Sequence, residues 1–270
     1  RKKEASLIEL AEQMIREVIQ WFPERRLRVV ADGFYATLAG KDLPHTTIIS
    51  RMQRNAELYD LPTQPRKTQR GRPRKKGKRL PSPEKMAPYV RQWKKVKARV
   101  RGHMQERLVY TRMVLWYRVS QKPVLLVICR DPQGKEKDDF FFTTDITMTA
   151  AEVIGCYGDR WAIEDTFKNT KQFLGGQQPQ TFQRQGPERA AGLSLWLYSV
   201  VWLWYLLQKS NRRTFKVQPW NPLKATPSFA DAIACLRRVL WRERIKCMFG
   251  VSAVHDKKFE FLLEALAPAA

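Results

Sequence analysis

The sequence is poor in the side chains that build zinc sites. It has four cysteines and three histidines in 270 residues, and none of them shows paired metal-ligand spacing. The cysteines stand singly at positions 129, 156, 235 and 247. A structural zinc site is therefore not expected, and unpaired thiols favour a reducing, cytoplasmic compartment.

Acidic residues are also scarce. Fifty Lys and Arg stand against 26 Asp and Glu, which leaves a formal net charge of +24 at pH 7. A field of this sign attracts polyanions and makes their binding depend steeply on salt, so nucleic acid is the expected partner. The 43% hydrophobic content excludes disorder of the whole chain and predicts one domain of about 170 residues that carries an insertion.

Only one stretch is long and uncharged enough to raise the question of a membrane span. Residues 190–207 include Trp and Tyr residues throughout, with two serines and a glycine among them. A spanning helix concentrates its aromatic residues at the two ends, so the composition favours a helix buried on most sides and no membrane partner.

The first fifty residues predict a helix and two strands. Residues 6–9 (Ser-Leu-Ile-Glu) form a capping box, and apolar residues then recur at helical spacing up to Ile19. The apolar run Leu27–Ala31 suits a buried strand, and Asp32 puts a carboxylate where that strand ends. Residues 46–49 predict a second strand. Functional sites in α/β domains favour such strand ends.

A strongly basic segment follows. Residues 62–101 contain sixteen Lys or Arg and one acid, Glu84. Its first part predicts a flexible arm over about residues 62–88, because charges outnumber apolar groups. The Arg70-Gly71-Arg72-Pro73 core resembles the AT-hook, so minor-groove insertion and general phosphate contact both stay open. The candidate DNA-binding residues of the arm are Arg70, Arg72, Arg74, Lys75 and Lys76.

The second part of this segment predicts a basic helix. Tyr89, Trp93, Val96 and Val100 recur at helical spacing among lysines. Such a helix would pack by its apolar stripe and offer its other face to DNA. Strands are expected to resume at 113–119, 124–129 and 140–144.

One further helix carries the residues of greatest chemical interest. A capping box at 149–152 predicts its start, and Gly175-Gly176 predicts its end. Tyr157, Arg160, Glu164 and Lys171 share one face of such a helix. A carboxylate held beside cations suits divalent-metal binding and contact with phosphate oxygens. The alternative is a solvated helix edge with an Arg160–Glu164 ion pair. Three apolar residues of this stretch are expected in the core, namely Trp161, Ile163 and Phe167.

The spacing Tyr157-x2-Arg160-x3-Glu164-x6-Lys171 resembles the signature of bacterial insertion-sequence transposases of the DDE, ribonuclease H-like class. The resemblance continues through 142–145 (Phe-Thr-Thr-Asp), 172–175 (Gln-Phe-Leu-Gly) and 29–35 (Val-Val-Ala-Asp-Gly-Phe-Tyr). It implies a DNA transposase that cuts and joins transposon ends by metal-dependent phosphoryl transfer. The implied cofactor is Mg²⁺, with Mn²⁺ as a substitute, and the implied partner is double-stranded DNA bound by a homodimer. The implied location is the bacterial cytoplasm, in association with the nucleoid.

The resemblance also implies an α/β fold, more closely a mixed α+β one. It consists of a ribonuclease H-like core that is truncated at its N-terminus, a β-rich basic insertion before the glutamate-bearing helix, and a helical C-terminal part. The expected divisions are 1–54 for the first part of the core, 55–146 for the insertion, 147–210 for the rest of the core and 211–270 for the C-terminal helical region.

The resemblance implies that Glu164 completes an Asp-Asp-Glu triad, and two aspartates compete to join it. On an unbroken helix from Thr149, Glu164 lies about 22 Å from the helix start, where Asp145 is expected. Two catalytic metal ions lie only about 3.5 to 4 Å apart, so Asp145 can share them only if the helix breaks at one of its glycines. Asp32 is therefore favoured as the catalytic and metal-binding partner of Glu164.

Only one helix precedes Asp32, so Asp32 resembles the second triad aspartate, and the first is expected upstream of Arg1. The chain would then be a fragment that binds DNA yet is inactive alone. A complete chain, with Asp32 first and Asp145 second, remains an alternative. Two other readings also stay open, a non-catalytic DNA-binding remnant and a different ribonuclease H-like nuclease. The residues expected to contact phosphate near the cleavage point are Tyr157, Arg160, Lys168 and Lys171.

Overall fold

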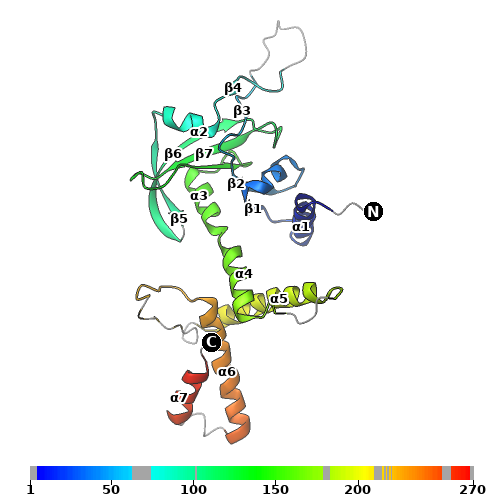
Figure 1. The fold of residues 1–270 in the computed structure, drawn as a ribbon, viewed down its shortest axis with the longest axis vertical. Coiled ribbons are helices and arrows are strands. Elements are labelled where there is room, and N and C mark those ends of the chain that lie inside the picture. Colours follow the sequence, from blue (N-terminus) through cyan, green and yellow to red (C-terminus); the bar gives the residue numbers. More distant parts are fainter. Residues whose placement is uncertain are drawn as a thin grey trace. The chain divides into compact units, whose positions relative to one another are not determined.

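The computed structural model describes residues 5–62, 74–100, 102–178, 183–209, 215, 217, 219, 221–250 and 257–267. The chain forms two compact units, residues 1–161 and residues 162–270 (Figure 1). The first unit mixes helices and strands, and the second is helical. This confirms the mixed α/β class and the helical C-terminal part that the sequence predicts.

The first unit is built around β-strands with helices before and after them. Its strands are β1 (Leu27–Ala31), β2 (Thr46–Arg51), β3 (Leu58–Tyr59), β4 (Arg79–Leu80), β5 (Lys94–Val100), β6 (His103–Val114), β7 (Val124–Arg130) and β8 (Asp139–Thr143). Its helices are α1 (Leu7–Trp21), α2 (Pro83–Met86) and α3 (Ala150–Asp159), with the 3₁₀ helices η1 (Gly33–Gly40) and η2 (Ala87–Tyr89).

A six-stranded sheet in the order β1-β2-β8-β7-β6-β5 organises this unit, and β3 pairs with β4 in a separate two-stranded sheet. β1 and β2 are parallel, whereas every other neighbouring pair of the large sheet is antiparallel. The sequence predicts residues 55–146 as an insertion into the core. In the structure, β5 to β8 from that stretch continue the sheet that β1 and β2 begin, and the division of the core at these residues stays a prediction.

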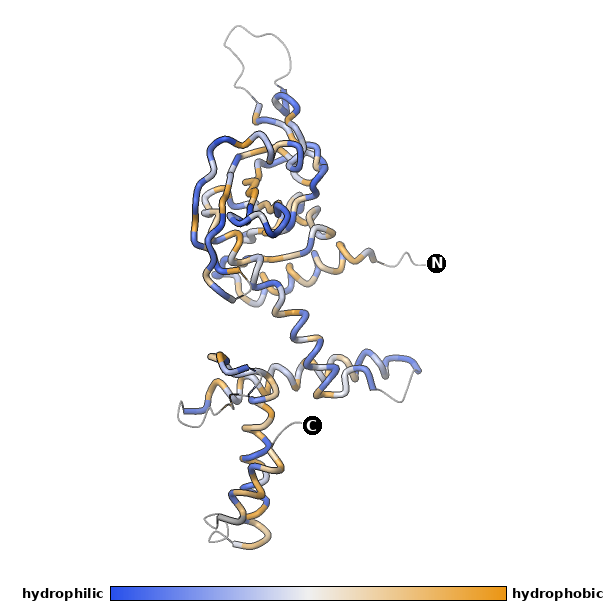
Figure 2. Tube along the Cα trace, turned by 60° about the vertical axis from the view of Figure 1, so that its left-hand side comes forward, coloured by the Kyte–Doolittle hydropathy of each residue, from blue (hydrophilic) through white to orange (hydrophobic). Residues whose placement is uncertain are grey.

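Each face of the sheet has its own hydrophobic core. On one face, α1, η1 and α2 cover residues that include Trp116 and Phe142, whose ring centroids lie 5.3 Å apart. On the other face, α3 packs Val153, Ile154 and Tyr157 against strand residues. Figure 2 shows the amphipathic turns of α1, which alternate between apolar and polar residues. The predicted capping boxes are present at the starts of α1 and α3.

The predicted basic helix is wrong, because this stretch is the edge strand β5. Val96, Ala98 and Val100 alternate inward along it, and the residues between them are exposed. A period of two matches a strand that buries one face, and the helical spacing of Trp93, Val96 and Val100 left out Ala98, which is also buried. Tyr89 ends η2 before the strand begins, and its side chain is 82% exposed.

The predicted continuous helix from Thr149 to the glycine pair is also wrong. α3 ends at Asp159, and α4 (Ala162–Phe173) begins after a turn formed by Arg160 and Trp161. The division between the two units falls in the same place. The predicted end near Gly175 is confirmed, because α4 ends two residues earlier and Gly175 has φ of +65°.

The second unit consists of α4 with α5 (Gly186–Leu207), α6 (Phe229–Phe249) and α7 (Lys257–Leu266). Tyr205 of α5 and Phe229 of α6 are fully buried at its core. By length and composition, α5 is the one helix among the described residues that could cross a membrane. The sequence predicts that it is buried on most sides. This is wrong, since only 17% of its apolar window is buried.

The residues expected in the core around the signature are not there. Trp161, Ile163 and Phe167 are 55%, 53% and 46% exposed. The prediction assumed that large apolar residues on an amphipathic helix face inward. The buried residues of α4 are instead Asn169 and Thr170.

Candidate active site

Asp32 and Arg51 come together at the carboxyl ends of two neighbouring parallel strands. β1 and β2 pair in register, with Ala31 opposite Ser50, and Asp32 and Arg51 are the next residues along each chain. Asp32 caps η1, because its Oδ1 accepts a hydrogen bond of 2.8 Å from the Gly33 amide. The Asp32 side chain is nevertheless exposed. Ligands of α/β sheets bind at this end of the strands, so the pair marks a candidate site.

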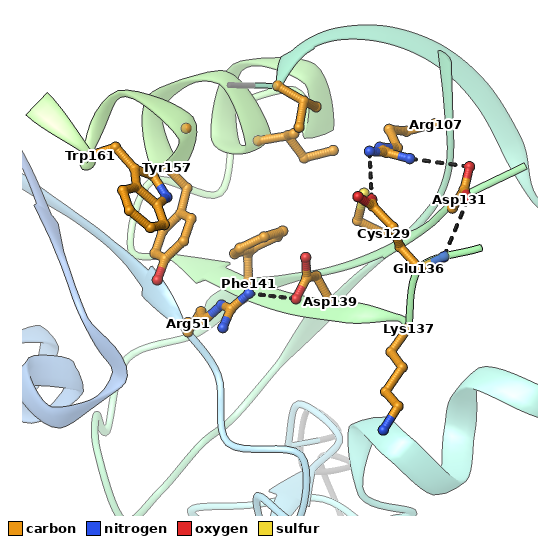
Figure 3. A pocket seen from close by; sticks show the side chains of 13 residues that line it. Arg51, Arg107, Cys129, Asp131, Glu136, Lys137, Asp139, Phe141, Tyr157 and Trp161 are labelled. Atoms are coloured by element: carbon orange, nitrogen blue, oxygen red, sulfur yellow. Dashed lines mark hydrogen bonds and ion pairs between the residues drawn. The ribbon is translucent and has the colours of Figure 1, made fainter. Parts of the chain in front are cut away.

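Helix α3 brings Tyr157 to the same place. Its ring packs on Phe141 of β8 with centroids 4.8 Å apart, and the residue is only 8% exposed. The guanidinium carbons of Arg51 and Arg160 each lie 5.7 Å from the centre of this ring. Figure 3 shows the Tyr157 hydroxyl directed toward Arg51. The ring is thus a packing element, and its hydroxyl reaches the charged edge of the sheet.

The pKa of the Tyr157 hydroxyl is shifted by the groups around it. Burial raises this pKa above its ordinary value, Arg51 and Arg160 oppose the rise, and the Asp32 carboxylate adds to it. These four residues therefore lie within electrostatic reach of one another, and we refer to them as the Asp32 cluster. The phenol stays protonated at neutral pH and can donate a hydrogen bond to an anion.

A small open pocket lies beside the Asp32 cluster and is lined by Arg51, Tyr157 and Trp161 among others (Figure 3). Arg51 Nη2 lies 2.7 Å from Asp139 Oδ1, so a carboxylate on β8 holds this guanidinium. Both side chains are about half exposed. The contact therefore orients Arg51 more than it stabilises the fold.

The far side of the pocket holds a buried arginine. Arg107 of β6 contacts Asp131 at 3.2 Å and Glu136 at 2.7 Å. The nearby Cys129 is buried, which raises the pKa of its thiol to about 12. The carboxylates around Arg107 satisfy its charge, so this end of the pocket is structural.

The Asp32 cluster presents one carboxylate, two guanidiniums and a phenol, a set that can hold phosphate oxygens beside an acid. Carboxylate oxygen is the ligand type that Mg²⁺ prefers, and Asp32 supplies it in an exposed position. Across the part of the chain that the structure describes, no three His, Cys, Asp or Glu residues gather in a way that could hold a metal ion.

Residues 1–121 match the family model described as DDE superfamily endonuclease. This match covers Asp32 and Arg51, and it ends before α3. A DDE endonuclease acts on DNA, and these nucleases use divalent metals. The matched DDE region therefore implies DNA as the substrate, and it contains two residues of the Asp32 cluster, Asp32 and Arg51. No curated protein was found to match the chain.

Glu164, Lys168 and Lys171 lie on α4, outside the matched DDE region. All three are exposed, and their spacing puts them on one face of the helix. The neighbouring Asp165 has a structural contact, because its Oδ2 accepts a hydrogen bond of 2.8 Å from Asn169 Nδ2. Glu164 belongs to the helical unit and Asp32 to the α/β unit. Their joint role at a metal stays a prediction.

Asp145, the competing aspartate, has short contacts of its own. Its Oδ1 accepts hydrogen bonds from the Thr147 hydroxyl at 2.6 Å and from the Thr147 amide at 3.0 Å. These hydrogen bonds, with smaller effects of Arg26 and Arg28, lower the pKa of the carboxyl below its ordinary value. Asp145 thus closes the turn between β8 and the cap of α3.

Of the predicted basic arm, Arg74, Lys75 and Lys76 are described and exposed, whereas Arg70 and Arg72 lie outside the described residues. Lys76 Nζ lies 4.1 Å from the ring centre of Tyr59 and 5.5 Å from that of Tyr117. Such cation–π contacts hold an ammonium group against the protein surface.

The backbone around Lys76 is also fixed. We call residues 59–61 with 76–79 the clasp. The Gly77 amide donates to the Asp60 carbonyl at 2.9 Å, and the Asp60 amide donates to the Lys78 carbonyl at 2.8 Å. A Cβ at Gly77 would lie 2.6 Å from the Leu61 carbonyl oxygen, so only glycine fits. The Asp60 carboxylate in turn pairs with Arg112 at 2.6 Å.

Arg51 was not among the residues predicted from the sequence. A signal was present, because Arg51 follows the predicted strand 46–49 closely, much as Asp32 follows the strand 27–31. That signal becomes informative only when the two strands are known to be parallel neighbours. Sequence periodicity does not reveal this pairing.

Proposed function

We propose that this chain is a DDE transposase that cuts and joins transposon DNA ends by metal-dependent phosphoryl transfer. The observation that carries the proposal is the position of Asp32, which lies at the carboxyl end of β1 beside Arg51, within the region that matches DDE endonucleases. The Tyr157-x2-Arg160-x3-Glu164-x6-Lys171 spacing supports the transposase assignment over other nucleases of this class.

Asp32 and Glu164 would hold the metal. Both offer exposed carboxylate oxygens, the hard ligands that Mg²⁺ and Mn²⁺ accept. When bound, divalent ions in such sites activate water or a 3′-hydroxyl and stabilise the leaving oxygen during in-line attack on a phosphodiester. The role of Asp32 does not depend on Asp145, whose carboxylate is already used in its turn.

The cationic side chains would bind the DNA strand around the cleavage point. Arg51 and Arg160 present planar donors to non-bridging phosphate oxygens, and Tyr157 donates a hydrogen bond from its protonated hydroxyl. Lys168 and Lys171 add point charges along α4. The arginines and lysines would neutralise charge on DNA, and the neutral Tyr157 hydroxyl would help to fix the strand relative to Asp32.

A second candidate is a DNA-binding protein without catalytic activity. It is favoured by one observation, namely that the described residues contain no group of three metal-binding side chains. The net charge of +24 would serve this function equally well.

Cleavage of the protein backbone by bound iron distinguishes the transposase proposal from the non-catalytic DNA-binding one. Fe²⁺ takes the place of Mg²⁺ at carboxylate sites, and with ascorbate and peroxide it cuts the backbone next to the site where it is bound. We expect cuts near both residue 32 and residue 164, which excess Mg²⁺ suppresses. Both sets of cuts should disappear together in Asp32→Asn and in Glu164→Gln.

Asp165→Asn is the matched control, since it removes a carboxylate one residue from Glu164 and should leave the cuts in place. Asp145→Asn should leave them as well. Cuts at only one of the two positions, or none that depend on these carboxylates, would overturn the catalytic proposal in favour of the DNA-binding one.

A further inference from the structure

The edge strand β5 carries a row of cations. Lys94, Lys95, Lys97 and Arg99 are all exposed, and the strand lies at the end of the sheet opposite β1 (Figure 1). No acid occurs between Glu84 and Glu106 in the sequence. This row is separate from the Asp32 cluster, which occupies the carboxyl ends of β1 and β2.

The arginines on the neighbouring strands differ from the β5 cations, because each of them pairs with a carboxylate. Arg107 of β6 pairs with two carboxylates, Arg112 of β6 pairs with Asp60, and Arg130 of β7 pairs with Asp138 at 2.6 Å. Their charges are therefore balanced by carboxylates from the connections beside the strands.

On β5, an ion pair is described for Lys95 alone, whose Nζ lies 2.9 Å from the Glu106 carboxylate across the strand pair. No ion pair is described for Lys94, Lys97 or Arg99, although Glu106 stands directly opposite Lys97 in the strand register. The Lys95 and Lys97 charges lower the pKa of Glu106. The edge therefore keeps a net positive charge along its whole length.

Lysine on an edge strand often has a simpler purpose, because it discourages pairing with the edge of another sheet. Here the cations are crowded, since Lys94 to Arg99 spans about 17 Å at 3.3 Å per residue. Neighbouring like charges repel one another and weaken the folded state. A bound polyanion would remove this repulsion.

We propose that β5 is a DNA-contact edge, on which Lys94, Lys97 and Arg99 neutralise backbone phosphates of a duplex. This inference rests on the proposed function, because it takes DNA as the partner. Lys97 and Arg99 lie on one face of the strand and Lys94 lies on the other. The length of the row corresponds to about five base-pair steps of 3.4 Å, so these cations can engage separate phosphates along the edge. Such contacts add affinity for any sequence and hold DNA at a distance from the Asp32 cluster.

The test compares the wild-type chain with Lys94→Gln/Lys97→Gln/Arg99→Gln by fluorescence anisotropy on a labelled duplex of arbitrary sequence. Each lost phosphate contact lowers the slope of log affinity against log salt by about 0.9, so the triple variant should lose about 2.7. The ratio of wild-type to variant affinity should then shrink about 40-fold between about 50 and 200 mM salt.

Two controls isolate the position and the charge. Arg118→Gln/Lys122→Gln/Lys135→Gln removes the same charge from exposed turns and should lower the slope much less. The charge-conserving variant Lys94→Arg/Lys97→Arg/Arg99→Lys should bind DNA as the wild type does. Thermal unfolding checks that all variants fold.

The outcomes distinguish this inference from the function on which it rests. A wild-type chain that shows no salt-dependent DNA binding defeats both. Steep wild-type binding with an unchanged slope in the glutamine triple defeats the β5 proposal alone. A similar loss in the charge-conserving triple also defeats it, since the effect would then not arise from charge. Loss of binding to anionic lipid vesicles with no change in DNA binding would assign the edge to a membrane instead.

Discussion

Replacement of Arg51 by Gln separates a binding role from a structural one. In the folded protein the Arg51 guanidinium has two described interactions, the half-exposed ion pair with Asp139 and the cation–π contact with Tyr157. The first is worth about 0.2 to 1 kcal/mol and the second about 0.5 to 1 kcal/mol. We therefore expect Arg51→Gln to destabilise the fold by about 1 kcal/mol. This lowers Tm by about 2 to 4 °C in a unit of this size.

The effect on DNA binding should be much larger. A hydrogen bond to a charged partner contributes about 1.5 to 3 kcal/mol, so loss of the Arg51 contact with phosphate should weaken binding about 10- to 150-fold. The salt slope should fall by about 0.9. Fluorescence anisotropy with a labelled duplex measures both quantities, and differential scanning fluorimetry measures Tm.

Asp139→Asn is the matched control for this prediction. It breaks the same ion pair but leaves the Arg51 guanidinium in place. Its stability should fall by about 0.2 to 1 kcal/mol, because only the ion pair is lost and the contact of Arg51 with Tyr157 remains. Its DNA affinity should stay the same or rise, since a negative charge is removed. Equal weakening of DNA binding in Arg51→Gln and Asp139→Asn would refute the phosphate-binding role.

Three further predictions concern groups around the site. Tyr157→Ala should cost about 3 to 5 kcal/mol in the free energy of unfolding, because the ring is buried against Phe141, whereas Tyr157→Phe should cost under about 1 kcal/mol; urea unfolding measures both. Asp145 has its pKa lowered below 3.8, so its stabilising effect is present at neutral pH and lost as the pH falls through the folded pKa. Unfolding curves of wild type and Asp145→Asn should accordingly converge in acid, and a constant gap would contradict this. Cys129, with a thiol pKa of about 12, should resist alkylation at pH 8 while the exposed Cys247 reacts, as mass spectrometry of the native protein can show.

Local signals in the sequence predict much of the fold. The capping boxes at Ser6 and Thr149 mark the starts of α1 and α3, and the apolar run Leu27–Ala31 is a strand followed by Asp32. Each of these features depends on residues within a few positions of one another. Interactions between residues close in the sequence are enough to identify these features.

The failures have a different origin. At 89–100 a helical spacing and a period of two coexist, and pairing of β5 with β6 decides between them. Nothing local marks the turn at Arg160 and Trp161 that separates α3 from α4. The partnership of Asp32 with Arg51 depends on the parallel pairing of β1 and β2, which is information about contacts and not about either strand alone.

Because the clasp fixes both ends of the arm, we expect the number of residues in the arm to have little effect on the sheet. Leu58–Tyr59 pairs with Arg79–Leu80, and Tyr59 also exchanges two backbone hydrogen bonds with Leu115, so both ends of the intervening chain are fixed at one point. For a flexible connection between two fixed ends, doubling the number of residues adds only about 0.6 kcal/mol of closure entropy. We therefore expect a change in the number of residues between the two strands to have little effect on the position of Asp32. This makes the stretch a natural place to graft a foreign DNA-reading peptide onto the protein.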